Sequence, residues 1–248
     1  VTGVQTCALP IFGTDGRVLG RGYSEFTQHF PQPGWVEHDA EEIWNVTRGV
    51  AREALEAATD AEVCSIGITN QRETVVLWDR NTLEPVHRAI VWQDRRTQPM
   101  CRALKDAGHE DEVRRRSGLV LDPYFSGTKI GWLLESDPTL RARAEAGELA
   151  VGTIDSWLIW LLTGGKVRAT DVTNASRTLL YDIHAGRWSD TLLDLLTVPS
   201  TVLPDVRDSA SDFGITEQNI WVFFVYVGAI GSAAIGDRKS TRLNSSHS

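Results

Sequence analysis

Short segments with strand periodicity alternate with segments of helical periodicity along most of this chain, and that alternation constrains the fold more than any other feature. Residues 63–69 have the apolar pattern of a buried strand, and residues 149–154 form another that leads into a helix over 156–162. Such alternation is typical of an α/β domain. We therefore predict a mixed sheet flanked by helices, within one large domain or two small ones.

The first elements are predicted to be strand, strand and helix. Thr14-Asp15-Gly16 carries the Asp-Gly signature of a hairpin turn between Phe12 and the strand over 18–26. Asp39 is placed to cap a helix, and Glu42 three residues later completes a capping-box pattern. The apolar face of that helix is expected to contain Ile43, Val46, Val50 and Leu55.

Further strands are predicted over 74–79 and 89–92, and we expect them to pair with residues 63–69 in the mixed sheet. The helix over 156–162 has Asp155 as its expected N-cap and Gly164-Gly165 as its stop signal. No internal repeat is found in the sequence.

Charge and cysteine content exclude several classes of protein. The formal net charge is −8 with scattered basic residues, which argues against a nucleic-acid partner. Cys7, Cys64 and Cys101 lie far apart without metal-ligand spacing, so we expect no metal site, no disulfide framework and a reducing, cytoplasmic location. The longest apolar run, residues 220–230, is too short to span a bilayer, so no membrane partner is expected.

The two ends of the chain differ from the rest. Residues 1–11 (VTGVQTCALPI) show no useful periodicity and no secretory signal, and residues 238–248 (RKSTRLNSSHS) form a polar, serine-rich tail. Both resemble translated sequencing-adapter DNA. We expect the native domain to cover residues 12–237, a hypothesis that uninterrupted genomic sequence through both peptides would overturn.

A polar cluster, residues 70–74, interrupts two predicted strands, and ligands bind at such strand ends in open α/β sheets. Arg72 and Glu73 offer a donor fork beside a carboxylate acceptor, which could grip a small polyol. The alternative is an Arg-Glu surface salt bridge of little energetic value.

Three other positions have a functional and a structural interpretation. Trp92, at a strand end, could line a ligand's carbons or could belong to the core. Tyr124, in a loop that leads into a helix, could offer its hydroxyl or could anchor the loop. Asp237, after a glycine- and alanine-rich segment, could accept a proton or could cap a helix. A further polar stretch, residues 171–178, is explained mostly by turn chemistry.

The sequence contains neither a GxxxxGK[ST] loop nor a GxGxxG motif, so these fingerprints give no support for nucleotide binding. Several long, ordered strings nevertheless resemble the FGGY family of carbohydrate kinases, and within it the members that phosphorylate glycerol. The resemblance covers about residues 12–237 and includes EFTQHFPQPGWVEHD from Glu25, ITNQRETVVLWDR from Ile68, AIVWQDRRT from Ala89, SGLVLDPYFSGTK from Ser117, GTIDSWLIWLLTGG from Gly152 and TDVTNASRTLLYDIH from Thr170.

The resemblance implies a ribonuclease H-like, actin-type fold, in which two domains close over a cleft and this chain supplies most of the first. It implies ATP-dependent phosphorylation of glycerol to sn-glycerol 3-phosphate by in-line transfer, with Mg²⁺ bridging phosphate oxygens. Glycerol would be bound by Arg72, Glu73, Trp92, Tyr124 and Asp237, with Asp237 as the catalytic base. ATP and ADP would be its other partners, and homo-oligomerisation of the full-length enzyme stays open.

Two departures from the family pattern matter. The glutamines expected after Asp237 are replaced by Arg238-Lys239, and the chain enters just after the family's phosphate-binding hairpin. The adenine site would lie beyond Asp237, so the nucleotide-binding residues are unknown. We expect this polypeptide to lack kinase turnover on its own.

Two alternatives remain. The first is a related kinase for xylulose, ribulose, a hexulose or erythritol, which the surroundings of Arg72, Glu73 and Trp92 disfavour because those substrates are bulkier. The second is a ribonuclease H-like nuclease or noncatalytic module, and a nuclease would need clustered metal-binding carboxylates.

Overall fold

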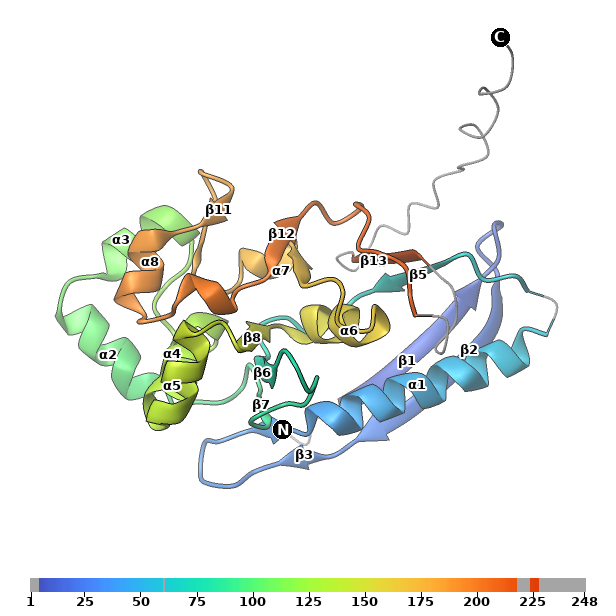
Figure 1. Ribbon diagram of the computed structural model, residues 1–248, viewed down its shortest axis with the longest axis horizontal. Coiled ribbons are helices and arrows are strands. Elements are labelled where there is room, and N and C mark those ends of the chain that lie inside the picture. Colours follow the sequence, from blue (N-terminus) through green and yellow to red (C-terminus); the bar gives the residue numbers. More distant parts are fainter. Residues whose placement is uncertain (1–4, 60, 218–223, 228–248) are drawn as a thin grey trace, which may run out of the picture.

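The computed structural model describes residues 5–59, 61–217 and 224–227, and it mixes helices with short strands (Figure 1). The strands are β1 (Gln5–Phe12), β2 (Val18–Phe26), β3 (Gln28–His29), β4 (Glu37–His38), β5 (Ser65–Ile68), β6 (Val76–Asp79), β7 (Ala89–Ile90), β8 (Leu149–Gly152), β9 (Ala169–Asp171), β10 (Tyr181–Asp182), β11 (Arg187–Trp188), β12 (Asp205–Arg207) and β13 (Phe224–Val227). The helices are α1 (Ala40–Ala57), α2 (Gln98–Asp106), α3 (Glu110–Ser117), α4 (Ser126–Ser136), α5 (Pro138–Glu145), α6 (Ile154–Leu162), α7 (Val172–Ala175), α8 (Asp190–Leu195) and the 3₁₀ helix η1 (Ser200–Val202).

The predicted hairpin is present, and its first strand is longer than expected. β1 pairs antiparallel with β2 from Gln5 to Phe12, and the turn contains Gly16 at a φ of 80°. Residues 6–10 are exposed or half-buried, so their pattern lacks the apolar alternation that identifies a strand from sequence. The strand therefore reaches into the segment that showed no useful periodicity.

Helix α1 lies along the hairpin (Figure 1) and is capped as predicted. The Asp39 carboxylate accepts hydrogen bonds from the backbone N atoms of Glu41 at 2.9 Å and Glu42 at 3.1 Å. The Glu42 carboxylate does not close the capping box. It accepts from the backbone N and hydroxyl of Thr27, at 3.1 and 2.9 Å, and so ties the helix to the end of the hairpin.

The sheet pairings are both parallel and antiparallel, which agrees with the α/β prediction. β6 pairs antiparallel with β8, and a bridge between Val75 and Ile90 joins β6 to the strand set β3-β4-β7. β5 pairs instead with β13, and β9 with β12, both in parallel. The expectation that residues 63–69 would pair with the two following strands was therefore wrong, because the pairing partner of β5 comes from a distant part of the chain.

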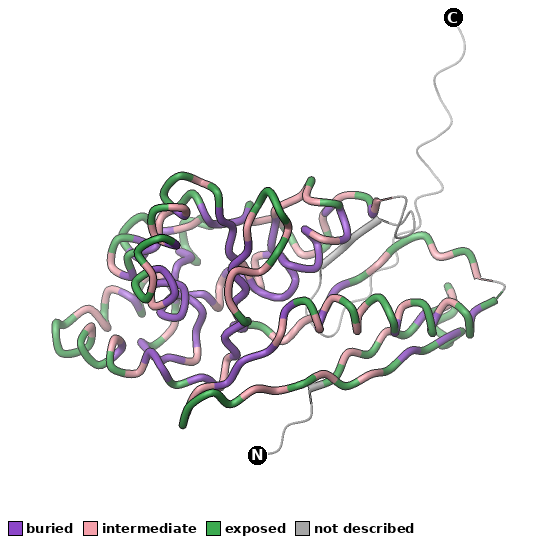
Figure 2. The backbone as a smooth tube through the Cα atoms, turned by 60° about the horizontal axis from the view of Figure 1, so that its bottom comes forward, coloured by how far each residue is buried: buried purple, intermediate pink, exposed green. Residues whose placement is uncertain are grey.

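The β6–β8 pair separates two hydrophobic cores. Val75 and Leu77 enter the core that contains α4, whereas Val76 and Trp78 enter the core that contains α6. This division follows from the alternation of side chains between the faces of a strand. Figure 2 shows the buried backbone concentrated in this central region, with the hairpin and α1 mostly exposed or intermediate.

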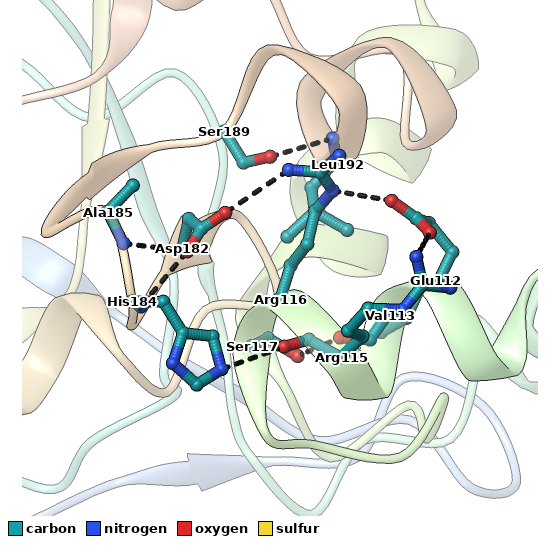
Figure 3. A network of polar contacts seen from close by, with 10 residues as sticks. All are labelled: Glu112, Val113, Arg115, Arg116, Ser117, Asp182, His184, Ala185, Ser189 and Leu192. Atoms are coloured by element: carbon teal, nitrogen blue, oxygen red, sulfur yellow. Dashed lines mark hydrogen bonds and ion pairs between the residues drawn. The ribbon is translucent and has the colours of Figure 1, made fainter.

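An ionic network attaches the β10–β11 hairpin to α3 (Figure 3). Arg116 donates from Nε to Glu112 at 2.6 Å and from Nη1 to Asp182 at 3.2 Å. The Asp182 carboxylate also accepts from the backbone N atoms of His184 and Ala185, at 3.0 and 2.9 Å. These hydrogen bonds and the charge of Arg116 hold the pKa of Asp182 below its usual value.

Helix α6 ends where the glycines predicted, but it begins differently. Gly164 and Gly165 have positive φ angles of 61° and 77° just after the helix, as a glycine stop requires. The N-cap residue is Thr153, and Asp155 lies inside the first turn, fully buried. Instead of capping the helix, the Asp155 carboxylate accepts hydrogen bonds from the side chains of Asn70, Thr153 and Thr170. Among the described residues, no helix is long and apolar enough to cross a membrane.

Candidate functional site

Four loop segments meet next to the central strands, and three of them carry residues predicted from the sequence. Glu73 lies in the turn between β5 and β6, Trp92 lies just after β7 and is separated from it by Val91, and Tyr124 lies in the loop before α4. The fourth segment, after α7, carries Arg177. The polar cluster at residues 70–74 thus lies between two strands, as the sequence predicted.

Glu73 has a strained backbone and a nearly buried side chain. Its φ is 66°, in the left-handed region, which costs an ordinary L-residue roughly 1–2 kcal/mol. Only 4% of its side chain is exposed. The Ser126 hydroxyl donates to the Glu73 carbonyl oxygen at 3.2 Å, which fixes this turn to the start of α4. Such strain persists only where surrounding contacts hold it.

Arg177 is the ion-pair partner of Glu73. Its Nε atom donates to Glu73 Oε1 at 2.6 Å, and its guanidinium carbon lies 4.9 Å from the ring centre of Phe125 and 5.8 Å from that of Tyr124. The structure therefore does not support a surface salt bridge between Arg72 and Glu73. Arg177 was missed at the sequence level because 104 residues separate it from Glu73 and its own segment has the composition of a turn.

Trp92 and Tyr124 lie side by side. Their ring centres are 5.2 Å apart and their planes are tilted by 55°. Both side chains are half-buried, so each leaves part of its surface open to a ligand. Through Arg177, these rings are linked to the Glu73 carboxylate, which brings three of the predicted site residues into one continuous set of contacts.

Lys129 anchors the loop that carries Tyr124. Its buried Nζ donates to the backbone oxygens of Tyr124 at 2.9 Å and Phe125 at 3.3 Å, and also to that of Pro123. Burial lowers the pKa of Lys129 to about 7, an effect that the carboxylates of Asp94, Glu73 and Asp122 oppose. No sequence pattern distinguishes this lysine from a surface one.

Arg72 differs from Glu73 in its exposure and in its hydrogen bonding. It is exposed, and within the described part of the chain it makes no hydrogen bond or ion pair. Glu73 Oε2 likewise accepts no hydrogen bond from a described residue. An exposed guanidinium and a carboxylate oxygen, each with unused hydrogen-bonding capacity, can together bind vicinal hydroxyl groups.

A second buried carboxylate, Asp155, lies at the start of α6. Its oxygens accept hydrogen bonds from Thr170 at 2.7 Å, from Asn70 at 3.3 Å and from Thr153. Burial raises the pKa of Asp155 to about 6, and the charge of Asp171 adds to this effect while the hydrogen bonds oppose it. Asn70 belongs to the same turn as Glu73, so this network connects that turn to α6 and β9.

Two further predictions concern the catalytic base and the metal ion. Asp237 lies outside the described residues. Within residues 5–59, 61–217 and 224–227, no group of three or more His, Cys, Asp or Glu side chains could hold a metal ion. The described side chains therefore do not fit a Mg²⁺ site, and no metal-dependent step is derived from them.

Comparison with known proteins relates this geometry to one family. Residues 2–243 match the N-terminal domain of the FGGY family of carbohydrate kinases. A glycerol kinase of Alcanivorax borkumensis is 61% identical over 216 residues, which cover 86% of this chain and 44% of the relative. A glycerol kinase of Bradyrhizobium sp. is 51% identical over 243 residues, which cover 97% and 48%. The chain thus spans under half the length of these relatives.

Solved structures of kinases also superimpose on this chain. Plasmodium falciparum glycerol kinase with ADP superimposes with a TM-score of 0.87 at 30% identity, covering 91% of this chain and 46% of that one. A xylulose kinase from Rhodospirillum rubrum superimposes with a TM-score of 0.83 at 20% identity, covering 91% and 47%. The second likeness concerns the fold alone.

Proposed function

The chain belongs to the FGGY family of carbohydrate kinases, and from this premise we propose that it forms the polyol-binding half of a kinase that transfers the γ-phosphoryl group of ATP to glycerol. The product would be sn-glycerol 3-phosphate, formed in glycerol catabolism. The identity of 51–61% to glycerol kinases supports this substrate over a pentulose, because the xylulose kinase relative is only 20% identical.

One observation carries the proposal: the nearly buried Glu73 carboxylate is linked through Arg177 to the Trp92–Tyr124 pair, and the adjacent residue, Arg72, is exposed and has no ion-pair partner among the described residues. A three-carbon polyol combines hydroxyl groups with a short apolar edge. Glu73 Oε2 would accept from one hydroxyl and Arg72 would donate to another. The aromatic rings would contact the carbon atoms, and the Tyr124 hydroxyl would complete the pocket.

The remaining parts of the reaction rest on the family pattern. ATP is the proposed phosphoryl donor and Mg²⁺ its proposed counter-ion, and neither is assigned to a described side chain. Asp237 is proposed as the base that removes the proton from the attacking hydroxyl. We place the reaction in the cytoplasm, in keeping with the three cysteines, which are all free within the described structure.

Calorimetric titration of the 248-residue chain with glycerol tests the proposal, with xylulose as the competing ligand. We expect heat from glycerol only, and loss of that heat in Arg72→Ala. Arg52→Ala is a matched control, because Arg52 is also exposed and its side chain makes no hydrogen bond or ion pair with a described residue. Equal binding of xylulose, or unchanged binding of glycerol by Arg72→Ala, would contradict the proposed substrate or the proposed site.

A further inference from the structure

Arg177 stands out among the charged residues of the structure because it contacts both halves of the candidate polyol site without being one of its predicted ligands. Its Nε atom donates to Glu73 at 2.6 Å, and its guanidinium lies over Phe125 and Tyr124 at 4.9 and 5.8 Å. A guanidinium can donate hydrogen bonds in its plane and stack on aromatic faces at the same time. Lysine cannot reproduce this combination.

We propose that Arg177 is a positioning residue, which holds the Glu73 carboxylate and the Tyr124 ring in the arrangement that binds the polyol. This proposal rests on the proposed function, since the arrangement has a purpose only if glycerol binds there. Arg177 itself acts through its neighbours and is not assigned a contact with the substrate.

The first argument concerns charge. The Glu73 side chain is 4% exposed, and a carboxylate so far from water needs a compensating cation. Among the described residues, its ion pair is with Arg177. Arg177 donates to Oε1, and no described residue donates to Oε2, so the ion pair compensates the carboxylate charge and leaves one oxygen for a ligand.

The second argument concerns geometry. Glu73 sits in the left-handed region at a φ of 66°, which the chain does not adopt without external contacts. Among the described residues, Ser126 donates a hydrogen bond to the Glu73 carbonyl oxygen and Arg177 donates one to its side chain. The Ser126 contact fixes the backbone, and the Arg177 contact fixes the carboxylate.

The third argument is that the segment of Arg177 is itself fixed. The backbone N of Gly127, in the first turn of α4, donates to the Thr178 carbonyl oxygen at 2.6 Å. A Cβ atom on Gly127 would lie 2.6 Å from that oxygen, so the two segments are in direct backbone contact. Arg177 therefore projects from a rigid base toward both Glu73 and the loop of Tyr124.

The test uses Arg177→Met and Arg177→Lys in the 248-residue chain, with Arg207→Met as the matched control. Like Arg177, Arg207 donates a hydrogen bond and stacks on an aromatic ring: it donates to the backbone oxygen of Asp212 and lies 5.7 Å from the ring centre of Phe213. Glycerol affinity is measured by calorimetry. In the absence of ligand, the Glu73 carboxyl resonance is followed by carbon NMR at one fixed pH, and Tyr124 is followed by fluorine NMR of fluorotyrosine-labelled protein, with Tyr124→Phe for assignment.

We expect Arg177→Met to weaken glycerol binding by about tenfold or more, with an intermediate effect for Arg177→Lys, while Arg207→Met binds like the parent. We also expect Arg177→Met to shift both the Tyr124 resonance and the Glu73 carboxyl resonance, because the guanidinium contacts both groups. If the parent and Arg177→Met bind glycerol equally, the positioning role is wrong and the proposed function stands.

If the parent chain binds no glycerol, the proposed site fails in this polypeptide, and the ligand-free spectra decide about Arg177 separately. Unchanged Glu73 carboxyl and Tyr124 resonances in Arg177→Met would then overturn the proposal. Changes in both, absent in Arg207→Met, would support it. If Arg177→Met does not fold, the Arg177→Lys variant supplies the same two readouts.

Discussion

The guanidinium carbon of Arg96 lies 3.7 Å from the ring centre of Trp35, and Trp132 covers it from a second direction at 4.8 Å. Only 1% of the Arg96 side chain is exposed, and it donates to Glu37 at 2.8 Å and to Asp94 at 2.8 and 2.9 Å. Asp94 in turn accepts from the backbone N of Val36 at 2.6 Å. This buried cation joins the β4 region to the segment that follows Trp92.

Arg96→Met should lower the free energy of unfolding by about 3–5 kcal/mol, because it leaves two buried carboxylates without their cation. Urea denaturation of the two proteins measures the difference. The loss should be smaller when Arg96→Met is combined with Glu37→Gln and Asp94→Asn, which remove the unpaired charges. A loss below about 1 kcal/mol for Arg96→Met alone would contradict this account.

Gly22→Ala should destabilise the packing of the hairpin on α1. A Cβ atom at this position would lie 2.0 Å from the Val50 carbonyl oxygen, so the strand and the helix would have to separate. We expect a loss of about 1–3 kcal/mol, the range for overpacking, measured by thermal and urea unfolding.

Gly49→Ala provides the matched control in α1, the helix on which Gly22 packs. An added Cβ there meets nothing within 4 Å, so the change should stabilise α1 by about 0.5–1 kcal/mol. If both glycine variants changed stability in the same direction, close backbone approach would not explain Gly22.

Asp155→Asn should change how stability depends on pH. The folded-state pKa of Asp155 is about 6, above its ordinary value of 3.8, so the folded state binds more protons than the unfolded state between these values. The contribution of Asp155 to the free energy of unfolding is therefore fully present below about pH 4 and is lost as pH rises through 6. The difference between these two pKa values corresponds to a loss of roughly 3 kcal/mol in the free energy of unfolding, and the asparagine variant should lack this loss.

The measurement is the free energy of unfolding of both proteins from pH 4 to 7. His38 has the opposite sign in this window, because burial lowers its pKa to about 4 and the folded state then binds fewer protons than the unfolded state. The parent alone can therefore show little net dependence on pH, and the difference between the parent and Asp155→Asn is the quantity to compare. A difference that does not vary with pH would contradict the prediction.

Lys129→Met should destabilise the loop that carries Tyr124. The change keeps the apolar stem but leaves the backbone oxygens of residues 123–125 without the ammonium group that they share. We expect a loss of about 2 kcal/mol or more in unfolding experiments, and weaker glycerol binding. Lys105→Met is the control, since the Lys105–Glu110 ion pair is on the surface and should change stability by less than about 1 kcal/mol. Equal losses in the two variants would argue against a special role for Lys129.

Local features of the sequence predicted local structure well. The Asp-Gly turn, the cap at Asp39 and the glycine stop after α6 were all confirmed. Each depends on residues within a few positions of one another, so the physical interactions that decide them can be read from neighbours in the chain. The capping box failed in its second half because Glu42 found a partner in Thr27, which the helix pattern does not include.

Describing the candidate site required both the sequence and the tertiary structure. Long family strings identified Arg72, Glu73, Trp92 and Tyr124 as site residues, and the structure places the last three in one set of contacts. Their roles in binding remain a prediction. Arg177 links these residues, but the sequence did not indicate this role, because the segment around Arg177 has only the composition of a turn.

The sequence by itself determined the family, through the long strings that it shares with that family. It also determined the alternation of strands and helices, because periodicity and capping act over a few residues. Only the tertiary structure decided that β5 pairs with β13, that Glu73 pairs with Arg177 rather than Arg72, and that Asp155 is buried. Strand partners, ion pairs and desolvation are set by groups that approach from distant parts of the chain, and such approaches exist only once the chain has folded.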